Sequence, residues 1–209
     1  MSGDPSIRPE KIAIARARLA AGYYETPGAI SRTVDQMLVE FDRCPVGEGD
    51  PYRDLAANLI AGNLPDIADV QDLDFESRVT GGRVDAILPL RLESLPGSGL
   101  WGCWQREYKI DSILVESKNY SKCVGNSAVD QTLRYIMITK RGNFAFLVSR
   151  SGFSTGARRT VSDLARHCNI LILPFSHNEL KSWCDSSLSQ IEKDRILRVK
   201  RNDIYRMAG

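Results

Sequence analysis

Apolar and polar positions alternate in a helical pattern over the first part of the chain. Residues 26–41 carry an apolar face at helical spacing, with Pro27 in the first turn. Residues 9–21, rich in Ala and Arg, predict an earlier helix, and residues 51–62 predict a later one. We therefore expect an N-terminal helical hairpin over residues 1–45, ended by the Gly- and Pro-rich segment CPVGEGDPY.

The pattern then changes to that of strands. Imperfect alternation over residues 68–79 and the segment VDAILPLRL within 83–92 predict two strands. The turn-forming SLPGSG leads into an extended stretch that ends in IDSILVESKNY. We expect three consecutive strands here, with the last two joined as a hairpin.

Helix-like and strand-like segments alternate after these strands. In order along the chain they cover residues 129–139, 144–148, 155–167 and 170–173. The two short continuous apolar runs predict strands buried on both faces, and the helices between them predict parallel crossovers. The expected fold class is therefore α/β, a mixed central sheet that is antiparallel first and parallel later. It occupies residues 46–175, and residues 176–209 predict amphipathic helices.

The predicted second and third strands carry the candidate chemistry, G-G-R-V-D at positions 81–85 and V-E-S-K at 115–118. Side chains alternate along a strand, so Glu116 and Lys118 project to the same side, and Asp85 on the adjacent strand can lie beside them. Two neighbouring carboxylates repel each other alone but form a hard-oxygen site for Mg²⁺ or Mn²⁺. Lys118 would orient or deprotonate the attacking water and offset charge in the transition state.

The apolar residues just before Glu116 indicate a central strand. A buried acid and lysine are costly there unless they have a function. The alternative interpretation is an exposed ion pair between Glu116 and Lys118 at the end of the strand, since E-x-K is a common tripeptide.

These residues resemble the PD-(D/E)XK nuclease superfamily, in which Asp stands on the second strand of a hairpin and (D/E)-x-K stands on the third, before a helix. The residues G-G-R-V stand here in place of the usual Pro before Asp85, and Glu116 follows Asp85 by 31 positions, a long spacing. The resemblance implies a restriction-endonuclease-like fold and an Mg²⁺-dependent (or Mn²⁺-dependent) nuclease. Such an enzyme hydrolyses DNA phosphodiesters in restriction, repair or anti-phage defence.

A second resemblance concerns the helix after the third strand. Gln131 and Tyr135 form Q-x-x-x-Y on one helical face, similar to the accessory motif of RecB-like members, where these residues contact substrate or support the lysine. The alternative for Tyr135 is an aromatic residue at the edge of the core.

The resemblance further implies a ligand set and a substrate surface. Metal ligands would be Asp85, Glu116 and the backbone carbonyl of Ser117. Asp54 is the best-placed extra acid, although a first-turn acid favouring the helix dipole explains it too. In Mrr-like members the region of Arg150, Arg158 and Arg159 runs near nucleic acid, so these are candidate phosphate contacts, or else solvated arginines.

The amino-acid composition narrows the classes of protein to which the chain can belong. Hydrophobic residues make up 43% and charged residues 26%, as in ordinary globular proteins, and a net charge of +2 does not by itself indicate a nucleic-acid binder. No apolar run is long enough for a membrane helix and the start lacks a secretory signal, so we expect a cytoplasmic protein. The five cysteines are scattered, and a zinc site of His167, Cys168, His177 and Cys184 fits no common spacing.

Two other hypotheses remain at this point. The protein can be a non-cleaving module that binds nucleic acid or a partner protein, or a nuclease subunit that works as a homodimer or with an effector or ATPase. Folding alone does not require Asp85, Glu116, Lys118, Gln131 and Tyr135 together, which favours a nuclease.

Overall fold

The computed structural model describes most of the chain. The described ranges are residues 27–64, 73–75, 78–79, 82–91 and 99–207. The helix predicted over residues 9–21, and part of the strand predicted over residues 68–79, lie outside these ranges.

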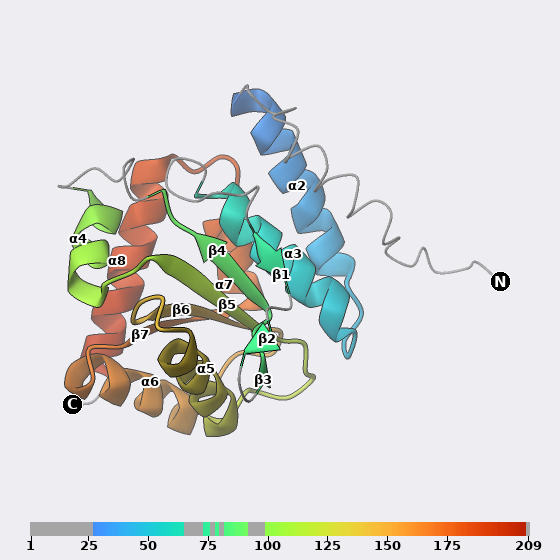
Figure 1. Cartoon of the computed structure of the whole chain (residues 1–209). Coiled ribbons are helices and arrows are strands. Elements are labelled where there is room, and N and C mark those ends of the chain that lie inside the picture. Colours follow the sequence, from blue (N-terminus) through green and yellow to red (C-terminus); the bar gives the residue numbers. More distant parts are fainter. Residues whose placement is uncertain (1–26, 65–72, 76–77, 80–81, 92–98, 208–209) are drawn as a thin grey trace.

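A mixed sheet of five strands, in the order β1-β4-β5-β6-β7, forms the centre of the molecule (Figure 1). Its strands are β1 (Asp74–Phe75), β4 (Ala86–Pro89), β5 (Ser112–Lys118), β6 (Phe144–Ser149) and β7 (Leu171–Ser176). The β1–β4 and β4–β5 pairs are antiparallel, and the β5–β6 and β6–β7 pairs are parallel. The predicted mixed α/β sheet is confirmed. Two further short strands, β2 (Arg78–Val79) and β3 (Gly82–Arg83), pair with each other.

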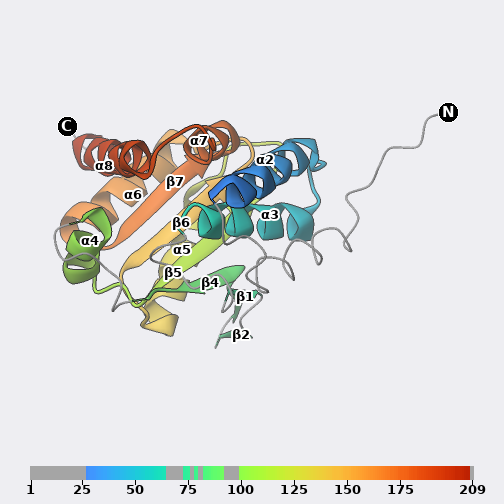
Figure 2. The ribbon, with the colours of Figure 1, turned by 90° about the horizontal axis from the view of Figure 1, so that it is seen from above.

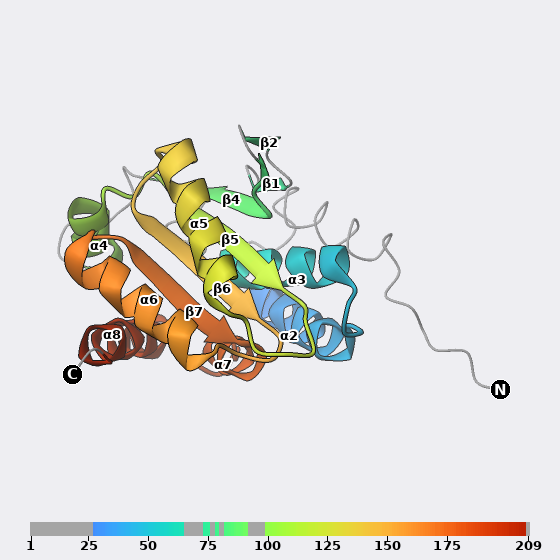
Figure 3. The ribbon, with the colours of Figure 1, turned by 90° about the horizontal axis from the view of Figure 1, so that it is seen from below.

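Helices cover both faces of this sheet. The crossover helices α5 (Asn126–Thr139) and α6 (Thr155–His167) lie on one face (Figure 3). The opposite face carries α2 (Pro27–Arg43), α3 (Gly49–Gly62) and α7 (His177–Trp183), and α8 (Gln190–Arg206) lies beside α6 and β7 (Figure 2). The helices predicted in these segments are confirmed.

The connection between β4 and β5 differs from the prediction. It contains a helix, α4 (Leu100–Tyr108), where we expected an extended stretch, so the two strands are antiparallel neighbours without forming a tight hairpin. Helical spacing buries Leu100, Trp101, Trp104 and Tyr108 on one side, and Lys109 ends the helix in a left-handed conformation.

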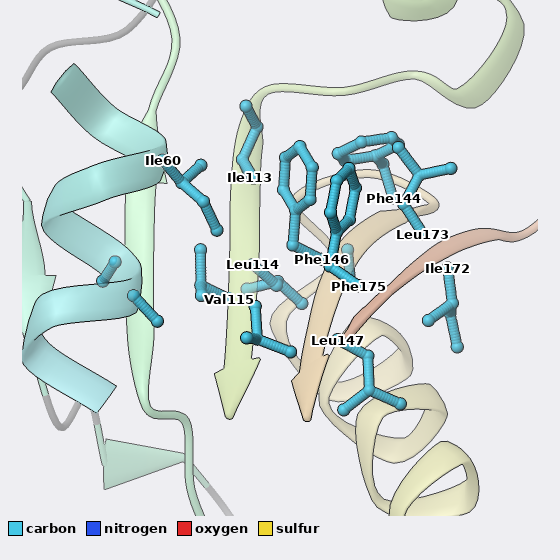
Figure 4. Packing of buried hydrophobic residues seen from close by; sticks show 14 of the residues in the cluster. Ile60, Ile113, Leu114, Val115, Phe144, Phe146, Leu147, Ile172, Leu173 and Phe175 are labelled. Carbon is cyan, nitrogen blue, oxygen red and sulfur yellow. The ribbon is translucent and has the colours of Figure 1, made fainter. Parts of the chain in front are cut away.

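Aromatic rings fill the core around β6. The ring centroids of Phe144 and Phe146 are 5.3 Å apart, and that of Phe175 is 5.7 Å from that of Phe146 (Figure 4). The ring centroid of Trp183 lies 5.8 Å from that of Phe146. Trp101 also packs edge-on against Phe144 at 5.8 Å, so its role is packing. Close-packed rings of this kind contribute much of the core's stability.

The predicted division into three segments does not separate three cores. Val34 and Phe41 of α2, and Leu197 and Ile204 of α8, belong to the same buried cluster as the sheet. The described parts of the N-terminal, central and C-terminal segments therefore share one hydrophobic core. Along the part of the chain that the structure describes, no helix has both the length and the apolarity to cross a bilayer.

We expect Phe146→Ala to lower the free energy of unfolding by about 3 to 5 kcal/mol, because it removes a fully buried ring and leaves a cavity. Urea denaturation measures this loss. Met137→Ala, at an exposed position of α5, should change the same quantity by less than about 0.5 kcal/mol. Equal effects of the two substitutions would contradict the packing described for β6.

Candidate functional site

The start of β4 brings Asp85 to the end of β5. Ala86 pairs with Val115, so Asp85 stands one residue before β4 and opposite Glu116. The Asp85 carboxylate accepts hydrogen bonds at Oδ2 from the Ser117 backbone N–H at 2.8 Å and from Ser117 Oγ at 3.0 Å. These bonds fasten the carboxylate beside β5.

Glu116 and Lys118 form a buried ion pair on one face of β5. Lys118 Nζ donates to Glu116 Oε1, as expected for residues that alternate along a strand. The side chains are only 2% (Glu116) and 12% (Lys118) exposed, so the pair does not lie in solvent at a frayed strand end. The alternative of an exposed ion pair is therefore wrong.

Burial and charge shift the protonation of both residues. Burial raises the pKa of Glu116 to about 7, the charge of Asp85 adds to the rise, and Lys118 opposes it. Burial alone would lower the pKa of Lys118, but the attraction of Glu116 and Asp85 outweighs it and raises that pKa. Asp85, Glu116 and Lys118 thus act on one another electrostatically, and the lysine remains charged.

One carboxylate oxygen of this cluster is buried without a partner. Glu116 Oε2 has no hydrogen bond within the described part of the chain, and neither has Asp85 Oδ1. Burying an unpaired carboxylate oxygen is costly unless another group offsets its charge. A cation beside Glu116 would offset it.

The donor atoms at this position suit Mg²⁺ or Mn²⁺. Both ions prefer carboxylate, carbonyl and water oxygens. The N–H and C=O of a strand residue point to the same side, so the Ser117 carbonyl faces the side on which Asp85 lies. Among the described residues no three His, Cys, Asp or Glu side chains converge, so the protein would supply two carboxylates and a carbonyl, and water would complete the shell.

Asp54 lies in a different set of contacts. Its Oδ1 accepts a hydrogen bond at 2.9 Å from Nε of Arg53, which also pairs with Asp50 at 3.1 Å. Asp54 does not complete a three-acid group with Asp85 and Glu116 in the described structure. The expected role of Asp54 as an extra ligand therefore has no structural support.

Gln131 and Tyr135 form a pair within α5. Gln131 Nε2 donates to the Tyr135 hydroxyl at 2.7 Å, and the Tyr135 side chain is buried. The described hydrogen bonds and ion pairs of the two residues do not reach Asp85, Glu116 or Lys118. The structure confirms that the two residues share one face of α5, and their role beside Lys118 stays a prediction.

The predicted phosphate contacts separate into two groups. Arg150 donates to the backbone carbonyls of Phe41 and Asp42, each at 3.3 Å, and so caps the end of α2. Arg158 lies 6.0 Å from the Phe153 ring, and Arg159 is exposed on α6. Arg150 therefore has an internal role that the sequence did not indicate.

Asn119 is a buried residue beside the site that the sequence pattern did not single out. Its Nδ2 donates to the backbone carbonyls of Pro45 at 2.7 Å and Glu48 at 2.8 Å, and its backbone carbonyl accepts from the Gly47 N–H at 3.0 Å. Asn119 thereby attaches the α2–α3 loop to the end of β5, next to Lys118. Its position directly after E-S-K was the only available signal.

The zinc alternative finds no support in the described residues. His177 stacks on Phe41 with centroids 4.4 Å apart and contacts Asp42 through Nε2 at 3.1 Å. Cys184 is buried, whereas Cys168 is exposed. His177 thus packs against α2, and the Cys184 thiol donates to the backbone carbonyl of Leu59 in α3 at 3.8 Å.

We expect metal-free protein to lose stability as the pH rises through about 7, because the folded protein holds a proton on Glu116 that the unfolded protein releases near the ordinary glutamate pKa of 4.5. The contribution is greatest below the lower pKa. Glu116→Gln, which cannot ionise, should reduce this loss by roughly 1 to 3 kcal/mol in urea titrations between about pH 5 and pH 8.5. Asp163→Asn on α6 is the control, and an unchanged profile in Glu116→Gln would refute the assignment.

Comparisons of the sequence and fold with protein-family models, with curated proteins and with solved structures find no match in any of the three.

Proposed function

We propose that this protein is a divalent-metal-dependent phosphodiesterase that hydrolyses DNA at the end of β5. The observation that carries this proposal is the convergence of Asp85, Glu116 and Lys118, with Glu116 Oε2 buried and unpartnered among the described residues. An acid pair with a buried, unsatisfied oxygen is a poor solution for folding alone. It is a suitable one for binding a cation.

Asp85, Glu116 and the Ser117 carbonyl would hold Mg²⁺ or Mn²⁺. When bound, such an ion polarises a phosphoryl oxygen and lowers the pKa of bound water. The hydrogen bonds from Ser117 keep the Asp85 carboxylate in place before any ligand arrives. This preorganisation reduces the reorganisation needed during the reaction.

Lys118 would act as a charged hydrogen-bond donor. Its pKa is raised, so it keeps its proton near neutral pH and is poorly suited to deprotonate water. Its Nζ lies against Glu116 Oε1 and would offset negative charge that develops on the phosphoryl oxygens. Orienting the attacking water and offsetting charge in the transition state therefore fit the structure better than deprotonating the water.

The order of elements supports a restriction-endonuclease-like fold within this α/β structure. Asp85 precedes an antiparallel strand, E-S-K ends the next, and a helix then crosses to a parallel strand. The resemblance to PD-(D/E)XK nucleases makes DNA the substrate we propose and makes restriction, repair or anti-phage defence the expected setting. Helix α4 between the two strands is an addition to that pattern.

Removing either acid or the lysine should abolish Mg²⁺-dependent cleavage of DNA. We expect Asp85→Asn, Glu116→Gln and Lys118→Ala each to lower the cleavage rate at least about 100-fold, because each removes a charge from the reacting centre. Gel assays on plasmid and oligonucleotide DNA measure the rates, and circular dichroism confirms folding. Asp163→Asn should retain full activity, and full activity in Glu116→Gln would disprove the proposal.

Metal binding provides an activity-independent test. Millimolar Mn²⁺ or Ca²⁺ should raise the melting temperature of the wild-type protein by about 3 to 6 °C at a tenfold excess over the dissociation constant. Asp85→Asn and Glu116→Gln should abolish the rise, whereas Asp163→Asn should keep it. A wild-type protein that does not respond to either ion would favour the non-cleaving binding module instead.

A further inference from the structure

Helix α8 presents an outward face that is not used by the core. Its buried residues are Lys193, Leu197 and Ile204. The side chain of Val199, which points outward from α8, is 51% exposed, a high fraction for an apolar residue in a helix that packs against the core. This face is therefore available to a partner.

Charged residues on this face are arranged symmetrically about Val199. Arg195 and Asp203 stand four residues before and after it, and Glu192 and Arg206 stand seven residues before and after. All four are exposed. Steps of four and seven residues return to the same side of an α-helix, so these side chains share the face of Val199.

We propose that this face binds a second copy of the same protein, with the two α8 helices antiparallel about a two-fold axis at Val199. Arg195 then lies level with Asp203 of the second copy, and Glu192 lies level with Arg206 of the second copy. Each contact occurs twice, as an isologous interface requires. A parallel arrangement would set every charge against its own copy, so the charges select the antiparallel one.

The four charged residues can make these contacts without losing strong internal ones. Arg195 has no hydrogen bond or ion pair within the described structure. Asp203 and Arg206 form a loose, exposed pair at 3.8 Å, which contributes little. Glu192 Oε2 accepts from Ser189 at the helix start, and Oε1 remains for a second partner.

Apolar area beside this face supplies the attraction that exposed charges lack. A hollow of about 670 Å³ lies between α7 and α8, and Phe175, Trp183, Ile196 and Val199 form its apolar walls. A second α8 laid along the face would cover part of this hollow. Burial of apolar surface then stabilises the dimer, and the charges set its register.

The interface lies away from the proposed catalytic centre. Helix α8 lies beyond β7, at the opposite edge of the sheet from β1 and β4 (Figure 2). Pairing through α8 would therefore not cover the end of β5 in either copy. The proposed dimer therefore does not depend on the proposed hydrolysis.

Sedimentation equilibrium of the full-length protein between about 1 and 200 µM tests the pairing. We expect reversible dimerisation in this range. Arg195→Glu and Asp203→Arg should each weaken it at least about tenfold, because each creates like-charge contacts twice. The double variant Arg195→Glu/Asp203→Arg should return to within about threefold of wild type, since it restores both opposite-charge pairs. Arg159→Glu, an exposed change on α6, should have no effect.

Mixing the two single variants gives a second test. The Arg195→Glu and Asp203→Arg proteins, each weak alone, should form a mixed dimer with opposite charges at both contacts. One contact joins the two substituted positions, and the other keeps the wild-type Arg195 and Asp203. Circular dichroism establishes that all variants fold. Any of three outcomes would overturn the proposal. The wild-type protein could stay monomeric, the dimer could be insensitive to the single changes, or the double variant could dimerise as weakly as the single variants.

Discussion

The buried ion pair of Glu116 and Lys118 is the constraint around which the rest of the site is arranged. Moving charged groups out of water is costly. Both residues lie on β5, which is covered by α3 and stands between β4 and β6 in the sheet, so the pair bears this cost. The same dry surroundings raise the pKa of Glu116 and strengthen its interaction with Asp85. A bound cation would offset both effects. If the proposed metal binds, the cost of burying these charges in folding would contribute to its affinity.

The fold supports this pair from both ends. Antiparallel pairing with β4 places Asp85 beside the pair. Asn119, just after β5, binds the α2–α3 loop, and Arg150, just after β6, binds the end of α2. The aromatic core around Phe146 makes the parallel half of the sheet a rigid support. Self-association through α8 would use the opposite edge of the sheet, so the proposed dimer interface and the proposed catalytic site lie on separate parts of the molecule.

The periodicity of apolar residues predicted most helices and strands of the fold, but it did not predict helix α4. Residues 129–139 and 155–167 show helical spacing, and the apolar runs at 144–148 and 170–173 show buried strands, so the mixed sheet followed from local pattern. Helix α4 was missed because it is short and rich in aromatic residues, which favour strands by propensity. Packing of Trp101 against Phe144 decided in favour of the helix.

The sequence by itself determined that Glu116 and Lys118 share a face, because two residues along a strand always return to the same side. The tertiary structure alone decided that the pair is buried, that Asp85 reaches it from 31 positions away, and that Asp54 and Arg150 are engaged elsewhere. Local geometry depends on neighbouring residues, whereas burial and long-range contacts depend on which segments the fold places against one another.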